Sequence, residues 1–100
     1  MDKYAHITKM ENIMVQQNET LKELNQLLDT IDAQREAYRN LLAYYYSEQR
    51  SKDLVDDENH LIPENIRRGV LSEDEIFDFI GDYRDTAIRM LEIGVKMLKE

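Results

Sequence analysis

The stretch "RRGVLSEDEI", residues 67–76, predicts where one helix ends and the last helix begins. Gly69 suits the position just past a helix end, and Arg67 and Arg68 suit the last turn, where positive charge meets the negative end of the helix dipole. Pro63 suits a first helical position, because its missing N–H is not needed there. These residues together predict a short helix over about 63–68.

The second part of the stretch predicts the start of another helix. Ser72 is a good N-cap, and Glu75 three residues later completes a capping box. Glu73 and Asp74 place negative charge in the first turn, where the helix dipole favours it. Leu71 and Ile76 have the spacing of a hydrophobic staple. We therefore predict a helix over about 73–99, and every residue of "VLSEDE" has a structural task.

This last helix carries two adjacent apolar seams. One seam contains Ile76, Ile80, Tyr83, Ala87, Met90, Gly94 and Met97, and the other contains Phe77, Gly81, Arg84, Ile88, Leu91, Val95 and Leu98. Two seams one residue apart form a stripe wide enough to face two partner helices.

The first half of the chain carries a heptad repeat. Its two series are Ile7, Met14, Leu21, Leu28, Arg35, Leu42 and Met10, Gln17, Leu24, Ile31, Tyr38, Tyr45, with no glycine or proline from residue 1 to 62. Because the heptad phase does not shift over these twelve positions, the pattern favours one continuous helix over about 3–47. The alternative is a break at "DTID", residues 29–32, where Asp29 or Thr30 could cap a second helix.

Length and composition indicate a single all-α domain over residues 1–100. The chain has 42% hydrophobic residues but three glycines and one proline, which is too little turn chemistry for a β fold. Cysteine is absent, which excludes disulfides and thiolate metal sites. The beginning of the sequence lacks a secretory pattern, and the longest apolar run is far shorter than a membrane span, so we expect a cytoplasmic protein without membrane contact.

The net charge of −8 is uneven along the chain. Residues 53–85 hold eleven acidic residues against three arginines, so this segment alone carries −8 and the rest of the chain balances. Such a field repels phosphate backbones and argues against direct nucleic-acid binding. It leaves open a basic protein partner, including a role as an acidic decoy for a protein that handles nucleic acid.

Carboxylates on the last helix are the main candidate for catalysis. Glu75, Asp78 and Asp82 point to one side of that helix and could hold magnesium in a metal-dependent nucleotide or phosphoester hydrolase. The same stripe continues through Asp85 to Arg89, Glu92 and Lys96, with opposite charges at helix-pair spacing, which is typical of a solvated face. We therefore assign no catalytic residue, metal or cofactor and keep the hydrolase as an alternative.

The tyrosines of "YYYSEQR", residues 44–50, are the other conspicuous feature. Tyr45 belongs to the heptad seam, whereas Tyr44 and Tyr46 flank it. Tyrosine is common at interfaces because its ring is apolar and its tip is polar. We interpret this cluster as closing the loop end of a hairpin, with Tyr44 and Tyr46 as interface candidates.

Three segments resemble a family of short bacterial helical proteins known only as a domain of unknown function. They are "MENI", "LLAYYYSEQRSKD" and "LIPENIRRGVLSEDEIFDFI". The resemblance implies an all-helical fold and no particular activity. Members of the family tend to have a tryptophan shortly after the tyrosines and serine, whereas this chain has Gln49 and Arg50.

These observations predict an all-α helical hairpin with coiled-coil-like packing. The helix over 3–47 is roughly 67 Å long and that over 73–99 about 40 Å, so the returning helix reaches back only to about residue 20. Ile7, Met10, Ile13 and Met14 are then left without a partner in the chain. They are the interface candidates, together with Leu21 of the same seam. We therefore expect a homodimer with four packed helices that acts in protein–protein interaction or assembly. A three-helix monomer, broken near Asp29, is the alternative.

Overall fold

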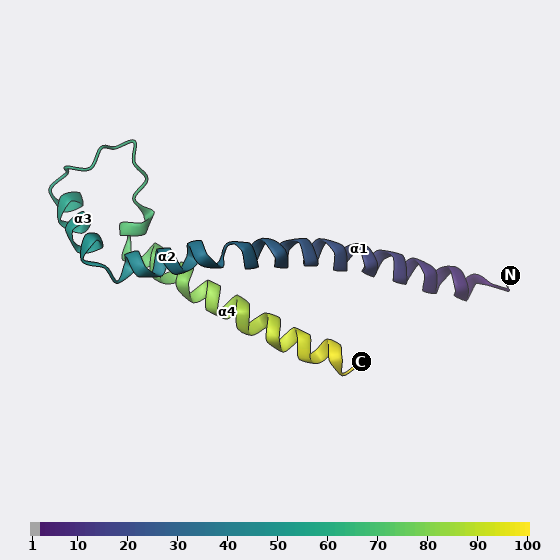
Figure 1. The fold of residues 1–100 in the computed structure, drawn as a ribbon. Coiled ribbons are helices and arrows are strands. Elements are labelled where there is room, and N and C mark those ends of the chain that lie inside the picture. Colours follow the sequence, from purple (N-terminus) through teal and green to yellow (C-terminus); the bar gives the residue numbers. More distant parts are fainter. Residues whose placement is uncertain (1–2) are drawn as a thin grey trace. The chain divides into compact units, whose positions relative to one another are not determined.

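The computed structural model describes residues 3–100, and every regular element in this range is a helix. The all-α prediction is confirmed. In chain order the elements are α1 (Ala5–Ala33), α2 (Arg35–Tyr45), α3 (Glu48–Glu58), the short 3₁₀ helix η1 (Gly69–Leu71) and α4 (Glu73–Leu98) (Figure 1). They belong to two compact units, Met1–Leu42 and Ala43–Glu100, and each is described by itself.

The first unit contains a helix that is interrupted at Gln34. The backbone N–H of Gln34 donates to the carbonyl of Thr30 at 3.0 Å and to that of Ile31 at 3.2 Å, so the last turn of α1 tightens towards 3₁₀ geometry. The carbonyl of Gln34 accepts in turn from the backbone N–H of Tyr38 at 3.0 Å. The prediction of one continuous helix over 3–47 is therefore wrong, because two helices meet at Gln34.

The alternative break at residues 29–32 is also wrong, since those residues lie inside α1. Gln34 has φ −87° and ψ −3°, close to helical values, and hydrogen bonds continue across it. A single displaced residue of this kind leaves the heptad phase of the sequence unchanged. Asp32 and Arg35 span the interruption with an ion pair of 3.1 Å between exposed side chains.

The second unit begins with the end of α2 and turns into α3 at Ser47. The Ser47 hydroxyl accepts from the N–H of Arg50 at 3.2 Å and donates to the carbonyl of Tyr44 at 2.6 Å. This side chain therefore caps α3 and also satisfies a carbonyl at the end of α2. No helix was predicted over Glu48–Glu58 from the sequence.

The end of α3 has the hydrogen bonds of a Schellman motif. Leu61 donates to the carbonyl of Asp56 at 2.9 Å, and His60 donates to that of Asp57 at 3.1 Å. His60, the first residue after the C-cap Asn59, has φ 56°, in the left-handed region that glycine usually occupies. A histidine at this position costs stability that a glycine would not.

The short helix predicted over 63–68 does not form. Pro63 instead starts a turn closed by a 3.1 Å hydrogen bond from the N–H of Ile66, and the 3₁₀ helix η1 follows from Gly69. Ile66 is half exposed, so a helix of six residues here would bury too little apolar surface to be stable. Arg68 consequently meets no helix end, and its guanidinium lies 3.2 Å from the carboxylate of Asp57.

The last helix agrees with the prediction for residues 73–99, since α4 runs from Glu73 to Leu98. Ile76, in its first turns, is the one hydrophobic residue of the described chain that is buried, at 3% exposure. Leu71 before the cap is half buried, as a hydrophobic staple requires. The hairpin arrangement of the long helices and their dimerisation stay predictions.

Candidate functional site

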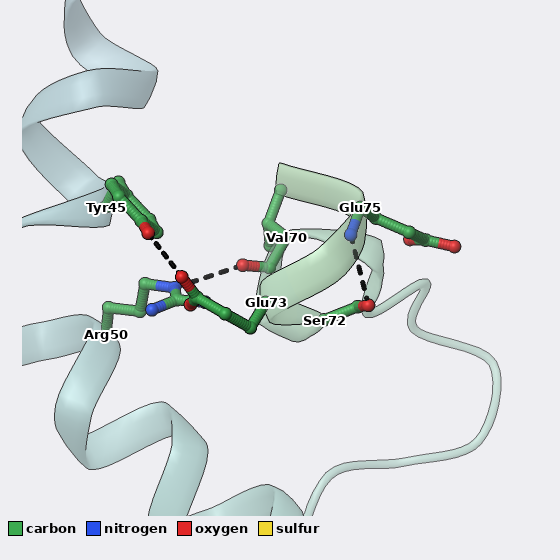
Figure 2. A network of polar contacts seen from close by, with 6 residues as sticks. All are labelled: Tyr45, Arg50, Val70, Ser72, Glu73 and Glu75. Carbon is green, nitrogen blue, oxygen red and sulfur yellow. Dashed lines mark hydrogen bonds and ion pairs between the residues drawn. The ribbon is translucent and has the colours of Figure 1, made fainter. Parts of the chain in front are cut away.

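The candidate site is built around the start of α4, where Ser72, in an extended conformation, separates η1 from α4. Ser72 has φ −77° and ψ 116°, and its hydroxyl accepts from the N–H of Glu75 at 3.3 Å (Figure 2). The predicted N-cap is confirmed. The N–H of Ser72 donates to the carbonyl of Gly69 at 3.0 Å, and the Glu75 carboxylate lies where a side chain at residue 69 would be. Glycine at 69 therefore makes room for Glu75.

Arg50 is the buried charged residue at the centre of this region, with 7% exposure. Its Nε donates to the carbonyl of Val70 at 3.1 Å, and its Nη2 donates to Oε2 of Glu73 at 3.3 Å (Figure 2). One guanidinium thus connects α3 with η1 and with the first residue of α4. A planar group with several donors suits this bridging role better than the single ammonium of lysine.

Tyr45 completes the network from the end of α2. Its hydroxyl donates to Oε1 of Glu73 at 2.5 Å, and the Arg50 guanidinium lies 4.7 Å from the centre of its ring (Figure 2). The hydrogen bond to the Glu73 carboxylate raises the pKa of Tyr45 above its ordinary value. We refer to Tyr45, Arg50, Val70 and Glu73 as the Arg50 network.

A second polar contact joins Tyr44 to α3. The Tyr44 hydroxyl donates to Oδ2 of Asp53 at 2.6 Å, and Gln49 donates to Oδ1 of the same carboxylate at 2.8 Å. Partial burial, and then the hydrogen bond to Asp53, raise the pKa of Tyr44 to about 12. The same hydrogen bond, followed by that from Gln49, lowers the pKa of Asp53.

A groove of about 400 Å³ lies beside this contact. Its apolar side chains come mainly from the loop after α3 and from η1. Its charged side chains come from α3 and from the end of that loop. It is lined by Tyr44, Asp53, Asp56, Leu61, Ile62, Pro63, Ile66, Arg67, Arg68, Val70 and Leu71. The lining contains two carboxylates, Asp53 and Asp56, and two arginines, Arg67 and Arg68, so the groove carries no net charge of one sign.

The carboxylates considered for metal binding are spread along α4. Glu75 lies against Gly69, whereas Asp78 and Asp82 are exposed one and two turns further on. Across residues 3–100 no group of three aspartate, glutamate, histidine or cysteine residues is arranged to hold a metal ion. The hydrolase alternative therefore gains no support from the geometry.

The interface candidates occupy two kinds of position. Those on α1 are exposed along one face: Ile7, Met10, Ile13, Met14 and Leu21. Tyr44 is half buried by its contact with Asp53, so it fastens α2 to α3. Tyr46 is 79% exposed, with its ring edge-on to that of Tyr45 at 4.9 Å. Tyr46 and the α1 residues are thus accessible to a partner. The hydroxyl of Tyr44 is already hydrogen-bonded to Asp53 within the second unit.

Sequence reasoning did not find the role of Arg50. Its partners lie 20 and 23 residues away along the chain, so no local spacing shows them. The available signal was indirect: an arginine close to the position at which relatives are expected to carry a large aromatic side chain. The Arg50 side chain lies over the ring of Tyr45 and so covers apolar surface.

Comparison with known proteins identifies the family but assigns no activity. Residues 7–93 match the family described as "Domain of unknown function (DUF4298)", and the chain belongs to it. No curated protein and no solved structure matches the chain. Within the described residues, no helix is both long and apolar enough to span a membrane.

Proposed function

We propose that this member of the DUF4298 family is an assembly module that self-associates through the apolar face of α1. This face, called the α1 seam, contains Ile7, Met10, Met14, Leu21 and Leu24, with Ile13 beside it. The proposed function is interaction between proteins and involves no chemical reaction.

The exposure of the α1 seam is the observation that carries the proposal. Ile7 and Met10 are each 55% exposed and Met14 is 60% exposed, although all three recur at the spacing that places them on one side of the helix. A single helix in water has no apolar surface of its own on which to bury such a face. Contiguous exposed apolar residues of this kind usually mark an interaction surface.

The small buried core supports the same conclusion. Of the hydrophobic residues between 3 and 100, Ile76 alone is buried, in a chain that is 42% hydrophobic. Burial of apolar area contributes about 25 cal/mol per Å², and a chain of this length is already marginal when its core is complete. Association buries further apolar area and stabilises the folded state.

A second copy of the chain is the proposed partner. A heptad seam is self-complementary, because its side chains pack between those of an identical helix. Two-fold symmetry is the commonest way in which identical chains close such a contact. A homodimer would have a mass of twice 11.9 kDa, about 24 kDa.

Sedimentation equilibrium over a series of concentrations tests the proposal. The expected result is a reversible monomer–dimer equilibrium whose weight-average mass rises towards 24 kDa with concentration. A mass that stays at 11.9 kDa up to hundreds of micromolar contradicts the proposal.

A further inference from the structure

The last helix presents a second apolar face, called the α4 outer seam. It contains Phe77, Gly81, Arg84, Ile88, Leu91, Val95 and Leu98. Three of its apolar side chains are well exposed: Phe77 at 66%, Leu91 at 72% and Leu98 at 88%. Nothing lies within 4 Å of the position that a side chain at Gly81 would occupy. This face is therefore open along the length of α4, with space at Gly81 for an incoming side chain.

A charged row borders the α4 outer seam on one side. Each of its members directly follows a seam residue in the sequence and is therefore rotated from it by about 100° around the helix. The row reads Asp78, Asp82, Asp85, Arg89, Glu92, Lys96 and Lys99. The first half of the row is wholly acidic, and the second half carries three bases and one acid.

This division of charge selects the orientation of a partner helix. Two copies of α4 packed in parallel would bring the acidic halves together, whereas an antiparallel pair brings each acidic half to a basic half. Charges on α1 offer no basic half, because its two lysines lie among five acidic residues: Lys9 and Lys22 against Glu11, Glu19, Glu23, Asp29 and Asp32. The basic half that best matches the acidic half of α4 is that of another α4.

The seam and the charged row share one centre. The midpoint between Phe77 and Leu98 falls between Ala87 and Ile88, and the boundary between the acidic and basic halves falls between Asp85 and Arg89. A two-fold axis near Ile88 therefore aligns the whole apolar seam and opposes the charges at the same time.

We infer that α4 pairs with α4 of a second copy, antiparallel, about a two-fold axis near Ile88. The inference rests on the proposed function, because it requires that the chain self-associates, and it specifies how one pair of helices is oriented. In this pair Ile88 lies opposite itself, Phe77 lies near Leu98 of the other copy, and Asp78 and Asp82 lie near the other copy's lysines.

Disulfide trapping tests the orientation, because the chain has no cysteine of its own. Ile88→Cys and Phe77→Cys are made separately and oxidised under native conditions, after circular dichroism has shown that each variant is as helical as the parent. A disulfide needs Cα atoms within about 7 Å. Two copies of residue 88 meet that limit in the antiparallel pair, whereas two copies of residue 77 lie about 33 Å apart along it.

The expected result is a covalent dimer for Ile88→Cys, none for Phe77→Cys, and one between Phe77→Cys and Leu98→Cys chains when they are mixed. A dimeric mass together with a Phe77→Cys disulfide, or without any Ile88→Cys disulfide, overturns the inference and leaves the proposed function standing. A monomeric mass for the unmodified chain overturns both. The two failures are therefore distinguishable.

Charge reversal provides an independent check. Lys96→Glu with Lys99→Glu places like charges opposite Asp78 and Asp82 and should raise the dimer dissociation constant roughly tenfold at low salt. Adding Asp78→Lys and Asp82→Lys to the same chain should restore association. Failure of this rescue, in a chain that is still helical, contradicts the antiparallel pairing.

Discussion

Arg50 and Glu73 lie 23 residues apart in the sequence, and their guanidinium and carboxylate meet at 3.3 Å. Arg50 is nearly buried, whereas the side chain of Glu73 is 63% exposed, so the arginine depends on the contact more than the glutamate does. The pair ties the start of α4 to the first turn of α3. The acidic residue that opens α4 thus serves both the helix dipole and this long-range contact.

Replacement of Arg50 should destabilise the second unit more than replacement of an exposed cation in the same helix. Arg50→Ala removes the hydrogen bond to Val70, the pairing with Glu73 and the cover over Tyr45, for an expected loss of about 2 kcal/mol. Lys52→Ala, an exposed position of α3, should change stability by less than about 0.5 kcal/mol. Urea denaturation measures both, and equal midpoints for the two variants would show that the Arg50 network contributes nothing.

Loss of the Ser72 cap should have a smaller effect. Ser72→Ala leaves the N–H of Glu75 without its acceptor and should cost about 1 kcal/mol. Ser51→Ala is the matched control, because Ser51 lies exposed within α3, where alanine is the better helix former. If Ser72→Ala keeps its melting temperature but loses self-association, then "VLSEDE" is a recognition motif and its structural interpretation is wrong.

A glycine at residue 60 should stabilise the chain. His60 has φ 56°, and His60→Gly relieves a left-handed conformation that costs a residue with a side chain roughly 1 kcal/mol. The neighbouring Asn59→Gly supplies the control, because Asn59 has φ −88° and a glycine there gains nothing while it adds freedom to the unfolded chain. Thermal unfolding should place His60→Gly above the parent and Asn59→Gly below it. The reverse order would contradict the Schellman assignment at the end of α3.

The raised pKa of Tyr44 predicts a loss of stability at high pH. Its pKa is about 12 in the folded chain against 10.0 ordinarily, so the protonated phenol stabilises the fold fully below pH 10. That contribution disappears as the pH rises from 10 towards 12, because the unfolded chain releases this proton first. Tyr44→Phe should therefore flatten the decrease in stability over this range.

The matched control for Tyr44 is Tyr46→Phe, which removes an exposed tyrosine next to it. Tyrosinate absorbance during an alkaline titration should lose its latest-ionising component in Tyr44→Phe and keep it in Tyr46→Phe. An unchanged late component in Tyr44→Phe would mean that the hydrogen bond to Asp53 does not hold this proton.

The start and length of α4 could be predicted from the sequence because their determinants are local. Ser72, the acidic first turn and the seam spacing all lie within the helix or next to it. The interruption at Gln34 could not be predicted, because it needs no glycine or proline and does not shift the heptad phase. Helix α3 was missed since its apolar content is small, and Pro63 was misread because proline suits turns as well as first helical positions.

Of the candidate site, the cap at Ser72 was predictable and the Arg50 network was not. The network depends on contacts between segments 20 to 28 residues apart, which no sequence period reveals. From the expected lengths of the helices we predicted that Ile7, Met10, Ile13 and Met14 have no partner within the chain and contact a second chain, and this stays a prediction. That prediction is the central claim of the proposed function.

Light scattering of the parent chain and of Met10→Glu tests this claim most directly. The parent should have a mass near 24 kDa at tens of micromolar, twice its 11.9 kDa, and Met10→Glu should have the monomer mass with its helical circular dichroism retained. Asn12→Glu adds the same charge on the opposite side of α1 and should remain dimeric. A parent mass of 11.9 kDa, or a Met10→Glu variant that stays dimeric, would contradict self-association through the α1 seam.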